Sequence, residues 1–274
     1  MFEQYVHGYR SEETARLNDQ ADALVELLHG DTHFGPGERV LEIGCGVGAQ
    51  TVILASRSPD ASFVAADIAP DSLAEASRRV SAAGLANVDF AAADVFALPE
   101  PGGIFAEASF DHAFVCFLLE HLPSPVEALQ RLGRLVRPGG TVTVIEGDHG
   151  STYFHPDDDA ARAAIACQVT LQQHAGGDAL IGRRLFPLLH QAGWSDIAVS
   201  PRMVYVDGSR PGLAESFTKR TFTAMIAGIR EPAVAAGLID VATFDAGVAA
   251  LKRTAEPDGV FCYTFFKAVA HRRT

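Results

Sequence analysis

Short apolar runs alternate with helix-like segments along the first half of this 274-residue chain. The apolar runs at 40–43, 62–66, 88–92 and 110–116 predict strands. Helices are expected from Ala49 to Ser56, from Pro70 onward and again after residue 124. This regular alternation of strands and helices is typical of an α/β fold with a parallel sheet.

Three glycines at alternate positions follow the first strand directly. Gly44, Gly46 and Gly48 let the backbone turn tightly and approach a ligand without an intervening Cβ. The helix that begins at Ala49 adds free N–H groups and a positive dipole end, so the segment predicts a nucleotide-type binding turn. Gly44-x-Gly46-x-x-Ala49 fits the dinucleotide fingerprint of NAD enzymes. Glu42 with the three glycines instead resembles the loop of class I S-adenosylmethionine (SAM) methyltransferases, and the loop alone leaves both interpretations open.

Acids at the ends of the next two strands separate these interpretations. Asp67 ends the second strand about 20 residues past the glycines, where a carboxylate can bind both hydroxyls of a ribose. NAD and SAM both need that contact, and a solvated acid at the head of the next helix would give the same pattern. After the third strand, Asp94, Val95 and the Leu98-Pro99 stop resemble the methyltransferase adenine pocket, in which a carboxylate accepts from the adenine amino group. The third strand therefore favours SAM.

Later motifs follow in the order found in class I SAM methyltransferases. The fourth strand runs into Leu119-Glu120-His121-Leu122, and Ser124-Pro125-Val126-Glu127 reads as a capping box with proline at the first helical position. That helix is expected to stop at Arg137-Pro138-Gly139-Gly140, before a fifth strand at Thr141–Ile145. The resemblance covers roughly residues 37–206 and 259–270. It implies a Rossmann-like seven-stranded sheet that ends in an antiparallel hairpin, with SAM as the cofactor.

The resemblance also assigns residues to the cofactor. Tyr5-Val6-His7-Gly8-Tyr9 and the charged residues after it are similar to the lid helix of ubiquinone- and menaquinone-biosynthesis methyltransferases and of similar natural-product enzymes. An ordinary amphipathic helix fits the same segment, because Leu17, Ala21, Leu24 and Leu28 form an apolar stripe. By resemblance, SAM is bound by Tyr9, Arg16, Gln20, Glu42, Gly44, Cys45, Gly46, Gly48, Asp67, Ile68, Asp94, Val95, Cys116 and Phe117.

Three parts of the chain are predicted: an N-terminal lid segment (1–36), a SAM-binding Rossmann-like domain (37–206 plus 259–274) and a helical cap (207–258). Helices are also expected from about Asp158 to His174 and from Ile181 to Ala192. The cap is inserted between strand six (Asp196–Val206) and strand seven (Val260–Val269), because the intervening residues are far too many for a hairpin loop. We expect it to cover the acceptor site with apolar side chains: Phe217, Phe222, Met225 and Ile226.

Composition fits a soluble cytoplasmic enzyme. Apolar residues make up 48% of the chain, yet no apolar run reaches the roughly 18 residues that span a membrane, and the charged N-terminus is not expected to be a signal peptide. Four widely spaced cysteines without a C-x-x-C pair suggest free thiols in a reducing compartment. The net charge of −12 argues against a nucleic-acid substrate and against anionic membranes. The expected partner is a small-molecule acceptor, and the expected assembly is a monomer or homodimer.

Polar groups after strand five supply the candidates for catalysis. Methyl transfer from SAM is an in-line displacement, and a base is needed only when the acceptor loses a proton. His149 is the first candidate because it follows strand five and titrates near neutral pH, with Asp148 as a partner for its other nitrogen. Tyr153 and His155 are second choices, and Glu120 after strand four is a further candidate. A packing or loop-anchoring role stays open for each.

The acceptor is the least defined part of the prediction. Aromatic and apolar cap residues indicate a small, flat, largely apolar molecule, such as an indole-containing or phenolic secondary metabolite, methylated on oxygen, nitrogen or carbon. The acids and histidines at 148–157 match no strong metal motif, so no metal is expected. Two alternatives stay open: a non-catalytic SAM-binding protein, and an NAD(P)-dependent oxidoreductase. The latter would need a Tyr-x-x-x-Lys or an equivalent hydride-site pair after strand four or five, and no Tyr-x-x-x-Lys directly follows either strand.

Overall fold

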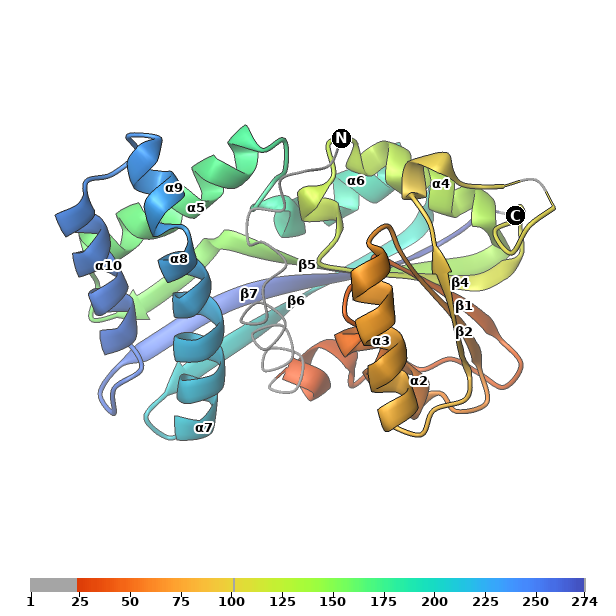
Figure 1. Cartoon of the computed structure of the whole chain (residues 1–274), viewed down its shortest axis with the longest axis horizontal. Helices are drawn as coiled ribbons and strands as arrows, with labels where there is room; N and C mark the ends of the chain where they lie inside the picture. Colours follow the sequence, from red (N-terminus) through yellow and green to blue (C-terminus); the bar gives the residue numbers. More distant parts are fainter. Residues whose placement is uncertain (1–23, 101, 274) are drawn as a thin grey trace. The chain divides into compact units, whose positions relative to one another are not determined.

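Figure 1 shows the computed structural model, which describes residues 24–100 and 102–273. The described chain forms two compact units. The glycine-loop unit consists of Val25–Glu146, Ile181–Pro201 and Phe266–Thr274, and the helical unit of Gly147–Leu180 and Arg202–Phe265 with Leu24. The predicted lid and its residues Tyr9, Arg16 and Gln20 lie outside the described residues.

Seven strands of the described chain form one sheet in the order β3-β2-β1-β4-β5-β7-β6 (Figure 1). Their bounds are β1 Arg39–Ile43, β2 Ser62–Asp67, β3 Val88–Ala92, β4 Phe110–Cys116, β5 Val136–His155, β6 Ser195–Asp207 and β7 Val260–His271. The sheet is parallel from β3 to β5. The predicted Rossmann-like seven-stranded fold is confirmed.

Strand register brings the ends of the parallel strands together. Ile43 pairs with Ala66 on β2 and with Val115 on β4, and Cys116 pairs with Ile145 on β5. The residues that follow β1, β2, β4 and the parallel part of β5 therefore meet at one edge of the sheet. Ligands of open α/β sheets bind outside this carboxyl edge.

The last two strands form the expected antiparallel pair. Ser195 Oγ at the start of β6 donates to the carbonyl of His271 at the end of β7, at 3.2 Å. Ser200 Oγ, further along β6, donates to the carbonyl of Lys267, earlier on β7, at 3.4 Å. Residue numbers therefore rise along one strand as they fall along the other.

β5 is longer at both ends than predicted, because β7 lies beside it in the sheet and bonds to it near both ends. Gly139 N–H donates to the carbonyl of Arg272 at 3.0 Å, so the Arg-Pro-Gly-Gly segment lies in the strand. At the other end, Thr264 N–H donates to Ser151 Oγ at 3.1 Å. The prediction of a loop directly after residue 145 was therefore wrong, since residues 146–155 continue the strand.

The glycine-loop unit contains the helices α2 (Ala49–Arg57), α3 (Pro70–Ala82), α4 (Pro125–Leu135) and α6 (Leu185–Gln191), and the 3₁₀ turns η1 (Val95–Ala97), η2 (Leu119–His121) and η3 (Ile181–Arg184). Proline begins α3 and α4, as its fixed φ favours. Ser124 makes no side-chain capping bond, so the predicted capping box was wrong. The single helix predicted over 181–192 is η3 followed by α6.

Apolar residues from these strands and helices form the core of the glycine-loop unit. Leu41, Leu132 and Val144 are fully buried in it. Trp194 is 2% exposed, and its Nε1 donates to the carbonyl of Leu129 on α4 at 3.1 Å. Burial of each such side chain contributes roughly 1.5–3 kcal/mol, so the strand ends at the carboxyl edge rest on a well-packed base.

The helical unit contains α5 (Asp159–His174), α7 (Pro211–Leu213), the π-helix η4 (Ala214–Thr223), α8 (Ala224–Gly228), α9 (Arg230–Ala235) and α10 (Val241–Arg253). Residues 207–258 are thus mostly helical, as predicted, while their role as a cap stays a prediction. α5 and α10 lie side by side (Figure 1), and the absence of a side chain at Gly247 allows this, since a Cβ there would meet the carbonyl of Ala160. The ten-residue π-helix was not predicted. Turns of π-helix are rare in proteins, and those that occur are often at functional sites.

Candidate active site

The three glycines after β1 occupy left-handed backbone conformations, with φ between 52° and 78°. A Cβ on Gly44 would lie 2.8 Å from Cδ2 of Leu118, and one on Gly48 would lie 2.9 Å from Ala76. A Cβ on Gly46 would meet no atom of residues 24–100 and 102–273 within 4 Å. The outer glycines are therefore required by packing within the protein, whereas the middle one faces open space where a ligand can approach the backbone.

Asp67 at the end of β2 holds this loop in place. Its Oδ2 accepts from Gly46 N–H at 2.8 Å, and its Oδ1 accepts from Ala69 N–H at 2.9 Å. Each carboxylate oxygen keeps a further lone pair with which it can accept from a ribose hydroxyl. The next residue, Ile68, is 51% exposed beside it, which suits an apolar wall for a base.

Glu42 is a buried acid beneath the loop. Its side chain is 2% exposed, and its Oε2 has no hydrogen-bond partner among the described residues. Burial raises the pKa of Glu42 to about 8, a shift that Thr51 opposes and the neighbouring charge of Asp67 supports. Burial likewise raises the pKa of the Cys45 thiol well above its usual range, so this loop cysteine is not a nucleophile.

The predicted adenine pocket lies after β3. Asp94 Oδ1 accepts from Phe96 N–H at 2.9 Å and thereby begins the turn η1. This bond uses one of its two carboxylate oxygens. Val95 is 6% exposed, so the structure places an acid and a buried apolar side chain in adjacent positions, as the resemblance requires.

The chain after β4 turns sharply at Phe117, which has φ 56°. Phe117 N–H donates to the carbonyl of Ile145 at 2.9 Å, and Cys116 is 9% exposed. Glu120 lies in η2, where its Oε1 is 3.7 Å from His121 Nε2. These residues reach the same carboxyl edge as the glycine loop.

Sequence reasoning missed Glu146, a fully buried acid that ends the parallel part of β5. Its Oε1 accepts from Leu118 N–H at 3.1 Å and from Leu119 N–H at 2.7 Å. Burial raises its pKa well above the usual range, and the charge of Glu120 adds to this effect. An acid directly after a buried strand was the signal that identified Glu42 and Asp67, and the same signal applies here.

In the helical unit, His149 is paired with a tyrosine. Tyr263 Oη on β7 lies 3.0 Å from His149 Nδ1, and the His149 side chain is 7% exposed. Gly147 makes room for this contact, because a Cβ there would collide with Tyr263 Oη. Tyr263 was not predicted as a site residue, since nothing in the sequence indicates which residue of β7 lies opposite His149.

Aromatic rings surround this pair. The His149 ring centroid lies 6.0 Å from that of Phe222 in η4 and 5.6 Å from that of Tyr263. The ring centroid of Phe222 lies 4.8 Å from that of Phe261, and the ring centroid of Tyr263 lies 4.7 Å from that of Phe265. Of the predicted cap residues, Phe222 therefore contacts the candidate base directly.

The other catalytic candidates have different surroundings. Asp148 Oδ1 accepts from Gly150 N–H at 3.0 Å, while Tyr263 holds Nδ1 of His149. Tyr153 is 50% exposed and its Oη donates to Met203 Sδ at 3.3 Å. His155 is exposed at the end of β5. The structure thus joins His149 to an aromatic cluster but leaves Tyr153 and His155 at the surface, where their predicted roles are untested.

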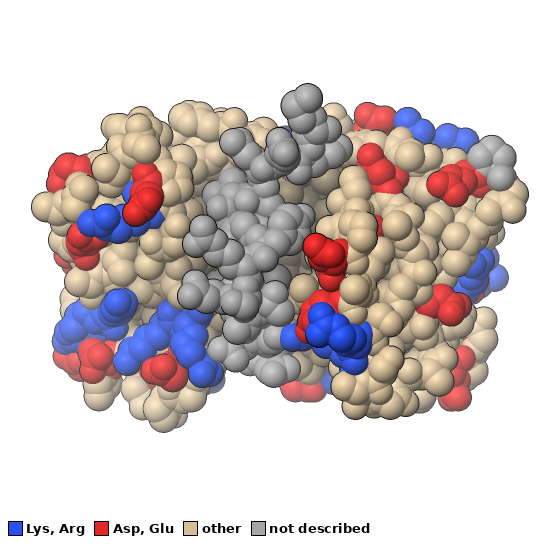
Figure 2. Space-filling model, viewed as in Figure 1, with Lys and Arg blue, Asp and Glu red and all other residues tan. Residues whose placement is uncertain are grey.

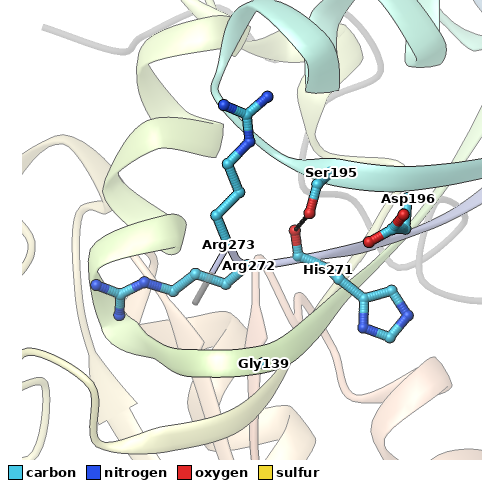
Figure 3. A pocket seen from close by; sticks show the side chains of 6 residues that line it. All are labelled: Gly139, Ser195, Asp196, His271, Arg272 and Arg273. Atoms are coloured by element: carbon cyan, nitrogen blue, oxygen red, sulfur yellow. Dashed lines mark hydrogen bonds between the residues drawn. The ribbon is translucent and has the colours of Figure 1, made fainter.

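A cavity of about 440 Å³ opens at the opposite edge of the glycine-loop unit, and it is lined by Gly139, Ser195, Asp196, His271, Arg272 and Arg273 (Figure 3). In Figure 3 the two arginine side chains point away from those of Asp196 and His271. None of the predicted site residues that the structure describes lines it. Because its polar groups diverge, this cavity is no candidate for the reaction site.

Charged side chains on the face shown in Figure 2 are mixed rather than gathered by sign. Within the helical unit, Arg230 pairs with Asp245 and Arg253 pairs with Asp258, both at 2.6 Å. Among residues 24–100 and 102–273, no three His, Cys, Asp or Glu side chains are grouped to hold a metal ion. No helix in that part of the chain is long and apolar enough to cross a membrane.

Comparison with known proteins matches residues 40–140 to the family described as "Methyltransferase domain". The demethylmenaquinone methyltransferase of Thermus thermophilus is 38% identical over 109 residues, which are 40% of this chain and 47% of that protein. The 27-O-demethylrifamycin SV methyltransferase of Amycolatopsis mediterranei is 30% identical over 139 residues, 50% of this chain and 49% of that protein. The chain thus spans about half the length of these curated relatives.

A solved structure agrees over nearly the whole chain. Phosphoethanolamine N-methyltransferase 2 of Haemonchus contortus, in complex with phosphomonomethylethanolamine and S-adenosylhomocysteine, superposes with a TM-score of 0.57. The match has 19% identity and covers 93% of this chain and 53% of that protein, so it shows the fold alone. The matched domain favours the SAM interpretation of the glycine loop over the dinucleotide interpretation. Residues 40–140 thus match a methyltransferase domain, and this part of the chain is similar to methyltransferases of quinone and natural-product biosynthesis.

Proposed function

We propose that this chain transfers the methyl group of SAM to a small, largely apolar aromatic acceptor that loses an N–H or O–H proton, such as an indole-containing or phenolic metabolite. His149 takes that proton. The observation that carries the proposal is the contact of 3.0 Å between His149 Nδ1 and Tyr263 Oη, inside a cluster of aromatic rings.

Residues at the carboxyl edge fit SAM as the cofactor. Gly46 leaves open space for a ligand, and Asp67 offers carboxylate lone pairs next to it. The unpartnered Oε2 of Glu42 can accept from a cationic amino group, and Asp94 with Val95 suits an adenine ring. When bound, SAM supplies an electrophilic methyl group whose bond to sulfur breaks as the acceptor's lone pair attacks the methyl carbon.

His149 is arranged to receive the proton of the acceptor. In the tautomer that this role requires, Nδ1–H donates to Tyr263 Oη and Nε2 carries the lone pair. The acceptor proton moves to Nε2, and Tyr263 stabilises the resulting imidazolium by continuing to accept from Nδ1. A positioned base of this kind contributes roughly 10²- to 10⁴-fold to a rate.

Aromatic surroundings favour a flat apolar acceptor. Phe222 and Tyr263 both present rings to His149, at 6.0 and 5.6 Å between centroids. Aromatic rings stack on indoles and phenols with geometries that aliphatic side chains do not offer. Arg230 and Arg253 pair with acids, and the net charge is −12, which supports a small-molecule acceptor over a nucleic acid that needs a basic track. The buried thiols at Cys45, Cys116, Cys167 and Cys262 fit a reducing compartment such as the cytoplasm.

The first test is mass spectrometry of the protein incubated with SAM and a panel of indoles, cyclic dipeptides, phenols and quinols. We expect one product heavier by a single methyl group, and fragmentation identifies the methylated atom. SAM binding in calorimetry without any methylated product would instead support the non-catalytic alternative.

Two matched variants test the base. His149→Ala should retain SAM affinity and lose turnover by about 10²-fold or more. His155→Ala removes a histidine from the exposed end of the same strand. Loss of turnover in the His155 variant alone would transfer the role of the base to His155, and normal turnover in both would show that the reaction needs neither.

A further inference from the structure

Glu146 connects two segments at the carboxyl edge of the glycine-loop unit. Its side chain is fully buried, and Oε1 accepts from the backbone of Leu118 at 3.1 Å and of Leu119 at 2.7 Å. Leu118 is the residue that precedes the 3₁₀ turn η2. N–H groups at the start of a helix have no acceptor within it, so Glu146 provides the acceptor that these two donors need.

A second bond fixes the same turn to β5. Phe117 N–H donates to the carbonyl of Ile145 at 2.9 Å, although Phe117 itself has the strained φ of 56°. Three successive N–H groups, from Phe117 to Leu119, therefore donate to two successive residues at the end of the parallel part of β5. This arrangement determines where the Leu118 side chain points.

Leu118 in turn packs against the glycine loop. Its Cδ2 lies 2.8 Å, and its Cδ1 3.0 Å, from the position that a Cβ on Gly44 would occupy. Leu118 therefore occupies the space that the missing side chain leaves. Any shift of Leu118 changes the packing of the loop whose middle glycine, Gly46, faces open space.

We infer that Glu146 is a positioning residue for the SAM site: through the backbone of Leu118 and Leu119 it holds Leu118 against Gly44 and so fixes the glycine loop. This inference rests on the SAM-binding part of the proposed function. Glu146 acts through the backbone of η2, and it is separate from the residues that we propose to contact SAM, which include Asp67 and Asp94.

The test compares two substitutions that differ in one property. Glu146→Gln keeps an oxygen that accepts from both N–H groups, whereas Glu146→Leu has similar size and no acceptor. Calorimetric titration with SAM should give an affinity within about threefold of wild type for Glu146→Gln and at least about tenfold weaker for Glu146→Leu, since buried donors are costly to leave unpaired. Thr143→Val is the matched control, because Thr143 is also buried on β5 but pairs with Phe114 away from the loop.

Kinetics separate positioning from a general loss of structure. Once an acceptor that the protein methylates is identified, its kinetics can be measured. Glu146→Leu should raise KM for SAM about tenfold and leave kcat at saturating SAM near that of wild type, because Glu146 lies outside the reacting groups. Equal affinity of wild type and Glu146→Leu for SAM would overturn the inference alone. Failure of the wild-type protein to bind SAM would overturn the cofactor assignment and the inference with it.

Leu118→Ala provides a second route if Glu146→Leu does not fold. This variant keeps both hydrogen bonds to Glu146 and removes only the contact with Gly44. We expect the same weakening of SAM binding, about tenfold, since the loop loses its support either way. Wild-type affinity in Leu118→Ala would show that the contact does not position the loop and would overturn the inference.

Discussion

Tyr263 Oη on β7 lies 3.0 Å from His149 Nδ1 on β5, and the contact is possible because residue 147 is glycine. The phenol ring packs where a side chain at 147 would project. A histidine held by one nitrogen has a fixed ring orientation, and in the tautomer whose Nδ1–H donates to the phenol oxygen, Nε2 carries the lone pair. Gly147 and Tyr263, which are 116 positions apart in the sequence, thus both determine how the His149 imidazole is held.

Tyr263→Phe should lower turnover while leaving SAM binding unchanged. The substitution keeps the ring and its packing but removes the group that accepts from Nδ1 of His149. Loss of the partner that orients a metal-bound histidine costs roughly 10- to 100-fold, and we expect a loss of similar size here. Single-turnover kinetics with an acceptor that the protein methylates measure the change in turnover, and calorimetry measures the affinity for SAM.

Tyr205→Phe is the control for the preceding variant, because Tyr205 is a half-exposed residue of the helical unit on β6. Its turnover should equal that of wild type. If Tyr263→Phe also keeps full turnover, the contact with His149 has no part in the reaction.

Gly147→Ala should reduce turnover and stability together. The added methyl group collides with Tyr263 Oη, so the ring must turn away from His149. Overpacking of this kind costs about 1–3 kcal/mol of unfolding free energy. Urea denaturation of Gly147→Ala in wild-type and Tyr263→Phe backgrounds tests the cause, since the loss should shrink when the hydroxyl is absent.

Gly228→Ala is the matched glycine variant, because a Cβ at Gly228 meets no atom within 4 Å in the part of the chain that the structure describes. It should retain both stability and turnover. An equal stability loss for Gly147→Ala in both backgrounds would mean that the Tyr263 hydroxyl is not the group that the methyl displaces.

The fold could be predicted from local patterns because each pattern has a local physical cause. The glycine loop after Ile43 needs positive φ angles, and the proline at 125 begins a helix. The antiparallel hairpin followed from the resemblance and is confirmed. The extension of β5 to His155 depends on pairing with β7, more than a hundred residues away, and that pairing left no local signal.

The site could be predicted only in part for the same reason. The strand-end acids Glu42 and Asp67 were found from their positions, and the structure places both beside the glycine loop. Tyr263 was missed because the register between β5 and β7 determines which residue lies opposite His149, and the sequence does not show that register. The π-helical form of η4, which brings Phe222 to His149, is likewise a tertiary outcome.

Asp67→Ala should abolish SAM binding. The substitution removes the two bonds that Asp67 makes to Gly46 N–H and Ala69 N–H, and it removes the carboxylate that we assign to the ribose. Charge-assisted bonds of this kind contribute enough to lower affinity by about 10²-fold or more. Calorimetry measures the change, with Asp71→Ala, an exposed acid in the first turn of α3, as the control. Wild-type affinity in Asp67→Ala would refute the ribose assignment.

His29 should make the protein sensitive to mild acid. Burial lowers the pKa of His29 from 6.5 to about 4, although its bond to Gln50 opposes the shift. The unfolded chain binds a proton first, so the stability that neutral His29 contributes is complete above pH 6.5 and is lost as pH falls toward 4. The loss is of order 3 kcal/mol. Urea denaturation across this range should show a smaller loss for His29→Gln and an unchanged loss for His174→Gln, an exposed control.

SAM binding should release a proton from Glu42. Burial raises the pKa of this carboxyl to about 8, so it is mostly protonated at neutral pH. The positive charge of SAM favours the carboxylate, and binding therefore expels the proton. Affinity should rise with pH up to about 8, by at most about tenfold per unit. Calorimetry in buffers of different ionisation enthalpy counts the released protons, and Glu42→Gln should release fewer than wild type, whereas Glu127→Gln, an exposed acid of α4, should match wild type. Equal binding enthalpies in all buffers for the wild-type protein would contradict a titrating acid at the site.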